Sequence, residues 1–264
     1  MTMTNTIVSE TRAKHDAARV ELLLGELRLP GLKLIWAKLA EQSDKEGWPA
    51  ARFLAAIAEH EMVDRGRRRM ERHLTEARLP AGKTLATFDF DSVPMVSKAQ
   101  VMALASGDAW LEKGANILLF GPPGGGKSHL SAGLGLALVE NGWRVMFART
   151  TDLVQRLQVA RRELALEAAI AKLDRYDLLI LDDIAYVTKD QAETSVLFEL
   201  IAARYERRSM LITANQPSIK ALAKRTTSVN HQSARPPRLI LIDAPFSPRL
   251  SRYKRTAGEA SKPF

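Results

Sequence analysis

The chain contains no cysteine, which excludes disulfides, thiolate nucleophiles and cysteine-ligated zinc. No uninterrupted apolar stretch approaches the ~20 residues that a membrane-spanning helix needs, and the amino terminus lacks the apolar block of a secretory signal. The five histidines show no metal-ligand spacing, so we expect any metal ion on oxygen ligands. Together these absences predict a cytoplasmic protein that makes no membrane contact.

Acidic residues are scarce only towards the carboxyl end. Residues 218–264 hold ten Lys/Arg and two Asp/Glu, whereas the rest of the chain holds 29 basic and 28 acidic residues. The net charge of +9 therefore comes mostly from this tail. Basic residues also gather on one predicted helix, as Arg65, Arg67, Arg68, Arg69 and Arg72. Such a cluster fits either a contact with DNA phosphates or a solvated helix face.

The length of 264 residues favours two folded units, because a single domain usually holds about 100–200 residues. We expect residues 1–16 to be a flexible terminus and residues 17–80 to be a small all-helical unit that holds DNA or a partner. Breaks between its helices are predicted at Pro30-Gly31 and at Gly47-Trp48-Pro49, with Pro49 in a first helical turn.

From residue 81 to residue 217 the pattern changes to short apolar runs that alternate with helices. Strands are predicted at 116–120, 144–148, 178–181 and 210–213, with helices at 127–140, 151–164 and 191–206. The strand runs are apolar on both sides of the pleat, as in buried parallel strands. This alternation predicts an α/β fold with a doubly wound parallel sheet, preceded by the helical unit.

The most informative motif follows the first of these strands. Gly121 to Ser128 matches G-x-x-x-x-G-K-[ST] between a strand and a helix, which is the context that a P-loop requires. Backbone N–H groups of such a loop surround phosphate oxygens, and the helix start adds its positive dipole end. We predict that ATP contacts Gly121, Pro122, Pro123, Gly124, Gly125, Gly126, Lys127, Ser128 and the following His129. Lys127 is expected at the β and γ phosphates, and Ser128 at Mg²⁺.

Polar side chains follow two later strands. Asp182 and Asp183 come after the strand at 178–181, and Asn215 comes after the strand at 210–213. The carboxyl ends of parallel strands form the edge where such sheets bind ligands. We expect Asp182 to hold Mg²⁺ through its water shell and Asp183 to orient or deprotonate the attacking water. Asn215 either hydrogen-bonds that water or the γ-phosphate, or simply starts a turn.

These motifs resemble the IstB family of insertion-sequence transposition helpers, relatives of the DnaC helicase loader and the DnaA initiator among the AAA+ ATPases. Besides the P-loop, the resemblance rests on five segments between about residue 18 and Pro217, namely 26–31, 84–90, 182–186, 203–207 and 212–217. It implies a weak or DNA-stimulated ATPase that oligomerises on duplex DNA and activates a partner transposase similar to IstA. It also implies that Asn215 is the sensor-1 residue, and it favours a DNA role for the arginine cluster.

After Pro217 the sequence departs from that family. A Trp-containing segment and an Asp-Arg-Leu motif, whose arginine completes a neighbouring subunit's site, are expected there but do not occur. Residues 218–264 instead predict one strand at 239–242 within a basic, proline-bearing tail that is otherwise either disordered or the product of a shifted reading frame. Two alternatives therefore stay open: a DnaC-like loader of a replicative helicase, and a hydrolysis-deficient scaffold that binds DNA when ATP is present.

Overall fold

A computed structural model describes residues 2–184, 191–215 and 239–243, with the backbone alone described for residues 2–11, 13 and 239–243. Contacts divide the chain into two compact units, 1–71 and 72–264, and the division falls inside helix α3 (Ala50–Ala77). The last turn of α3 belongs to the second unit, because Ala77 is fully buried in that unit's core. Glu76, in the same turn, forms an ion pair with Arg144, with its Oε2 2.7 Å from Arg144 Nη2. The division therefore lies ahead of residue 80, where the sequence suggested a boundary.

The first unit consists of α1 (Thr2–Glu26), α2 (Pro30–Glu46) and the main part of α3. Helix α1 begins well before residue 17, where the sequence placed the start of the helical unit. The sequence did not reveal the first half of this helix, because that half is polar and lacks an apolar stripe. Pro30 occupies the first turn of α2, where its missing N–H would be unpaired in any case. Pro49 stands one residue before α3, and its carbonyl oxygen accepts a hydrogen bond from the N–H of Phe53 at 3.2 Å, which closes the first helical turn. The flexibility of residues 1–16 stays a prediction.

Five parallel strands form the sheet of the second unit, in the order β2-β3-β4-β1-β5. They are β1 (Asn116–Phe120), β2 (Val145–Arg149), β3 (Leu178–Asp182), β4 (Ser209–Ala214) and β5 (Leu239–Asp243). The predicted α/β class and parallel sheet are confirmed. Strand β5 pairs with β1 and confirms the strand expected in the tail, while most of residues 218–264 lie outside the described part of the chain.

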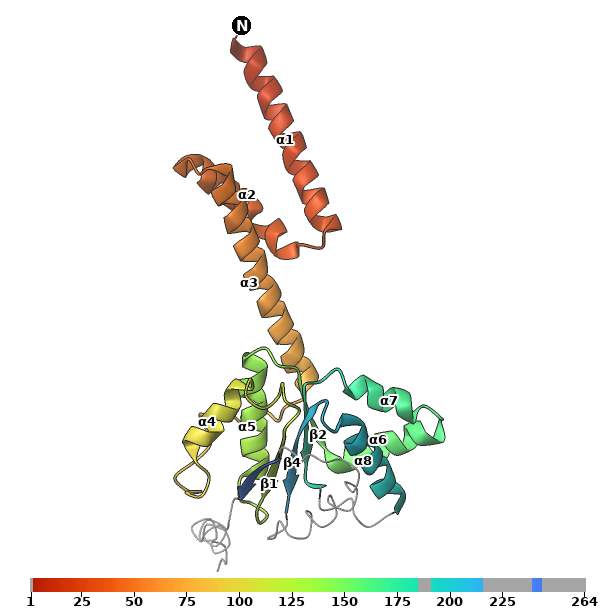
Figure 1. The fold of residues 1–264 in the computed structure, drawn as a ribbon. Helices are drawn as coiled ribbons and strands as arrows, with labels where there is room; N and C mark the ends of the chain where they lie inside the picture. The colour runs from red at the N-terminus through yellow and green to blue at the C-terminus, as the bar shows by residue number, and fades with distance from the viewer. Residues whose placement is uncertain (1, 185–190, 216–238, 244–264) are drawn as a thin grey trace, which may run out of the picture. The chain divides into compact units, whose positions relative to one another are not determined.

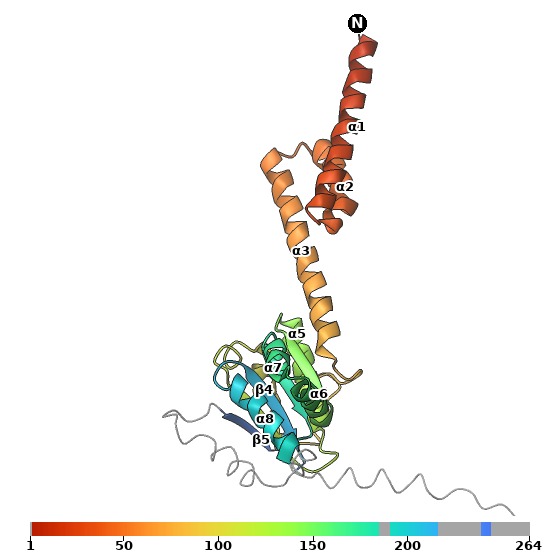
Figure 2. The same ribbon diagram turned by 90° about the vertical axis from the view of Figure 1, so that its right-hand side faces the viewer.

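Helices cover both faces of this sheet (Figures 1 and 2). They are α4 (Lys98–Ser106), α5 (Lys127–Glu140), α6 (Thr150–Arg162), α7 (Leu166–Leu173) and α8 (Gln191–Arg204). Successive strand residues point to opposite faces, so Ile117 packs with α4 and α5 whereas Leu118 packs with α6, α7 and α8. The sequence missed α4 and α7, which have nine and eight residues. Within the described part of the chain, no helix has the length and apolar character needed to span a membrane.

A fully buried arginine connects the helices of one face to the sheet. Arg204, at the end of α8, donates to the carbonyl oxygens of Leu173 at 2.8 Å, Tyr176 at 2.9 Å and Ser209 at 3.1 Å. Burial lowers the pKa of its guanidinium to about 10, although the neighbouring Asp174 acts in the opposite direction. These bonds join the end of α7 to the start of β4, which helps to set β3 and β4 side by side.

A segment of the second unit between α3 and α4, residues 84–90, packs closely on α5, and a glycine makes this approach possible. A Cβ added to Gly133 would lie 2.8 Å from the backbone nitrogen of Leu85 and 2.9 Å from the carbonyl carbon of Thr84. Distances this short between non-bonded heavy atoms force the backbone to shift. Gly133 therefore sets how near residues 84–85 come to the P-loop helix.

We predict that Gly133→Ala lowers the free energy of unfolding by about 1–2 kcal/mol, because the clash with backbone exceeds the helix propensity that alanine adds. Chemical denaturation followed by circular dichroism measures the change. Gly66→Ala is the matched control, since an added Cβ there meets nothing within 4 Å in the helical first unit. Equal stability of Gly133→Ala and the parent chain would show that residues 84–85 shift without measurable cost in stability.

Candidate functional site

The loop between β1 and α5 has the backbone conformation of a phosphate-binding turn. Gly124 and Gly126 adopt φ angles of +82° and +79°, which side-chain-bearing residues rarely adopt. Gly126 is the N-cap of α5 and gives no side-chain hydrogen bond to the first turn. The N–H groups at the start of α5 therefore need another acceptor, and an anion placed there would meet the positive end of the helix dipole.

Lys127 is the cation of this loop and is nearly buried. Its Nζ donates to the carbonyl oxygens of Gly121 at 2.9 Å and Pro122 at 2.8 Å. Burial lowers the pKa of the ammonium group, while the carboxylates of Asp183 and Asp182 act in the opposite direction. A cation that has lost most of its water and contacts neutral carbonyls gains from an anionic ligand.

Asp182, the last residue of β3, receives hydrogen bonds from two neighbouring elements. Its Oδ1 accepts from Ser128 Oγ in α5 at 2.9 Å and from Thr213 Oγ1 in β4 at 2.7 Å. The structure thus brings together the hydroxyl and the carboxylate that the sequence assigned to Mg²⁺. Hydroxyl and carboxylate oxygens are hard donors of the kind this ion takes, so these residues fit the predicted metal. Thr213 had not been singled out, because it resembles any threonine inside a strand.

Asp183 and Asn215 lie at the same edge of the sheet. Asp183 directly follows β3, has a φ of +61° and donates its backbone N–H to Thr213 Oγ1 at 2.8 Å. Asn215 directly follows β4 and is half-buried. Because Ala214 pairs with Phe120, Asn215 follows β4 at the level where Gly121 follows β1. Both residues are thus placed beside the P-loop, and their roles in hydrolysis stay predictions.

His129 contacts the segment at residues 84–90. Its Nε2 lies 3.1 Å from Thr87 Oγ1 and 3.1 Å from the carbonyl oxygen of Thr84. Its ring meets Phe88 edge-on with a centroid distance of 5.5 Å, and Phe88 also limits the space beside Gly126. Residues 84–90 therefore lie beside the P-loop. A direct contact of His129 with ATP stays a prediction.

The comparisons with known proteins identify the family. A family model described as IstB-like ATP binding protein matches residues 22–222, which is most of the chain. This chain belongs to the IstB-like ATP-binding proteins. The family resemblance read from the motifs is thereby confirmed.

Two relatives and one solved structure are similar to this IstB-like chain. A Sinorhizobium fredii protein named as an insertion-sequence ATP-binding protein is 76% identical over 202 residues, covering 76% of this chain and 68% of that protein. A Pseudomonas aeruginosa protein named as the ATP-binding protein of insertion sequence IS21 is 38% identical over 197 residues, covering 75% and 74%. AMPPCP-bound DnaA from Aquifex aeolicus shares the fold, with a TM-score of 0.52 at 19% identity over 70% of this chain and 58% of that chain.

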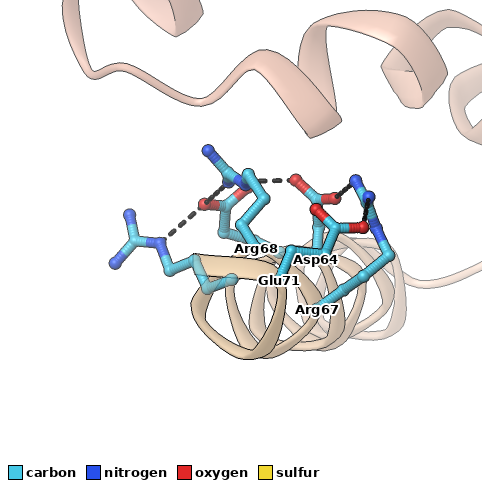
Figure 3. Close-up of polar contacts among 6 residues, drawn as sticks. Asp64, Arg67, Arg68 and Glu71 are labelled. Carbon is cyan, nitrogen blue, oxygen red and sulfur yellow. Dashed lines mark hydrogen bonds and ion pairs between the residues drawn. The ribbon is translucent and has the colours of Figure 1, made fainter. Parts of the chain in front are cut away.

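The arginine cluster of this IstB-like chain is largely paired within α3 (Figure 3). Arg65 bonds Glu61 at 2.6 Å, and Arg67 bonds Asp64 and Glu71, each at 2.7 Å. Arg68 contacts Asp64 at 2.9 Å and Glu61 at 3.4 Å. Among the residues that the structure describes, Arg69 makes no ion pair, and Arg72 lies in the electrostatic field of Glu76. The DNA role of all five arginines stays a prediction.

Proposed function

We propose that this IstB-like chain binds and hydrolyses ATP with Mg²⁺, and that it assembles on duplex DNA to help a partner transposase. One observation carries the proposal: Lys127, Ser128 and Asp182 come together where the P-loop meets the carboxyl ends of β3 and β4. A cation, a hydroxyl and a carboxylate at the start of a helix are the groups that hold a Mg²⁺-bound triphosphate.

Each residue of the site would have a separate role in ATP binding or hydrolysis. Ser128 and Asp182 would hold Mg²⁺, which when bound would supply positive charge against the negative charge that develops on the phosphates. Lys127 would exchange its two carbonyl acceptors for phosphate oxygens. Asp183 would orient or deprotonate the attacking water, and Asn215 would hydrogen-bond that water or the γ-phosphate.

The transposition role is supported by relatives whose names refer to insertion sequences. We infer from them that the partner is a transposase similar to IstA and that the chain acts as an oligomer on DNA. Loading of a replicative helicase would use the same nucleotide site. The two roles differ in the DNA that the protein binds, since a transposition helper assembles on long duplex.

We predict that Lys127→Ala weakens ATP binding at least about 30-fold, which corresponds to ~2 kcal/mol, because the site loses its phosphate cation. Titration of labelled ATP with Mg²⁺ measures this loss. Nucleotide-dependent assembly on long duplex, followed by electron microscopy with and without ATP, should disappear as well. Lys172→Ala, at an exposed position of α7, is the control and should retain both properties.

Unchanged ATP affinity in Lys127→Ala would refute the assignment of the nucleotide site. Assembly of the parent chain with a hexameric helicase, and failure to assemble on duplex, would favour the loader. Nucleotide-dependent DNA binding without turnover, with or without duplex DNA, would favour the hydrolysis-deficient scaffold.

For Asp183→Asn we expect ATP affinity within about twofold of the parent chain and turnover that falls about 10²-fold or more, because only the water-orienting carboxylate changes. Phosphate release under saturating ATP, with and without duplex DNA, measures the rate. Undiminished turnover would remove Asp183 from the mechanism.

We predict that Arg69→Ala lowers the salt dependence of DNA binding by about one unit in the slope of log K against log salt concentration, because one phosphate contact is lost. Arg67→Ala is the matched control: it removes the same charge from the same helix, but from a side chain already paired with Asp64 and Glu71. Fluorescence anisotropy on a duplex at several salt concentrations measures both slopes. Equal slopes for the two variants would show that the cluster is a solvated face.

A further inference from the structure

The peptide bond between Asp182 and Asp183 is held at both ends by threonine hydroxyls. Thr150 Oγ1 donates to the carbonyl oxygen of Asp182 at 2.9 Å. On the other side, the N–H of Asp183 donates to Thr213 Oγ1 at 2.8 Å. Thr150 and Thr213 are essentially inaccessible to solvent, at 0% and 1% exposure, so water does not compete for these hydrogen bonds.

Side chains hold this peptide because the strand pairing stops here. The pairing of β2 with β3 ends at Arg149 and Asp182, and the pairing of β3 with β4 ends at Leu181 and Ile212. Buried backbone N–H and C=O groups nevertheless require partners. Thr150, the first residue of α6, and Thr213, inside β4, supply those partners from the two elements that flank β3.

The clamped peptide determines where the Asp183 side chain leaves the backbone. Asp183 adopts a φ of +61°, in the left-handed region that side-chain-bearing residues other than Asn and Asp rarely occupy. Holding the preceding peptide plane limits the rotation that would return Asp183 to an ordinary conformation. Thr213 also donates to Asp182 Oδ1 at 2.7 Å, so one hydroxyl orients parts of both aspartates.

We propose that Thr150 and Thr213 are positioning residues that clamp the Asp182–Asp183 peptide and thereby aim the Asp183 carboxylate at the attacking water. This inference rests on the ATPase activity proposed above. The threonines contact neither nucleotide nor water in this scheme and act only through the aspartates. The effect of Thr150 should therefore fall on turnover, with little effect on ATP binding, whereas Thr213 also orients the proposed Mg²⁺ ligand Asp182.

Thr150→Val is the cleaner test, because valine retains the shape of threonine and this hydroxyl contacts only the Asp182 carbonyl among the bonds described. We expect kcat to fall about 10²-fold, as for a reacting group displaced by about 1 Å, with the KM for ATP within about threefold. Thr150→Ser keeps the hydroxyl and should keep kcat within about threefold. Thr213→Val should lower kcat as well, but its KM does not enter the test, because this hydroxyl also donates to the proposed Mg²⁺ ligand Asp182. Thr213→Ser should retain kcat within about threefold. Thr151→Val, next to the clamp, is the matched control and should match the parent chain.

Combination with Asp183→Asn shows whether the clamp acts through that carboxylate. In the Asp183→Asn background, Thr150→Val should lower kcat by less than about twofold, because residues acting as one unit are not additive. Far-ultraviolet circular dichroism and the midpoint of thermal unfolding establish that each variant is folded, and Thr213→Val carries the test if Thr150→Val does not fold.

Undiminished kcat in both folded valine variants would overturn the clamp, as would an equal loss in the serine variants or a full additional loss in the Asp183→Asn background. A rise in KM at unchanged kcat in Thr150→Val would also overturn it, because Thr150 would then act on binding. Absence of turnover in the parent chain would refute the proposed ATPase instead. In that case the clamp would have no role in hydrolysis either. Turnover of the parent chain therefore distinguishes failure of the proposed ATPase from failure of the clamp alone.

Discussion

The arrangement of the site depends on the hydrogen bonds that converge on one oxygen, Oδ1 of Asp182. Ser128 reaches this atom from the P-loop helix and Thr213 reaches it from β4, so three separate elements are tied at one point. Hydrogen bonds to an ionised group contribute about 1.5–3 kcal/mol each, and a half-buried carboxylate without them would be unfavourable. This contact, together with the pairing of β1 with β4, holds the P-loop helix against the carboxyl edge of the sheet.

Much of the second unit could be predicted because its signals are local. The strand at 116–120, the loop that follows it and the helix at 127–140 have the bounds that the sequence predicted. Helices α4 and α7 were missed because two turns give too few apolar repeats to reveal a period. The positions of Asp182 and Asp183 were predictable for the same reason as the strands, since each follows a short apolar run.

The roles of Thr150 and Thr213 were not predictable, because they arise from residues far apart in the sequence. A threonine has high strand propensity, and nothing in its immediate neighbours distinguishes a packing residue from one that bonds Asp182. Only the order β2-β3-β4 places both hydroxyls beside one peptide.

The ion pairs of the arginine cluster, by contrast, are local and could have been predicted. Glu61 and Asp64 stand four residues before Arg65 and Arg68, a spacing from which the intrahelical ion pairs could have been predicted.

Charge balance explains why the proposed ligand needs a divalent ion as well as Lys127. The ammonium group lies in the field of two carboxylates, Asp182 and Asp183, and this field opposes the effect of burial on its pKa. A triphosphate placed against the loop would add negative charge beside those same carboxylates, and one lysine offsets only part of it. Repulsion between like charges at short range in a partly buried site is large. A divalent cation held by Ser128 and Asp182 would turn that repulsion into attraction. The hydroxyl and carboxylate that join the P-loop helix to the sheet would then also hold the ion on which triphosphate binding depends.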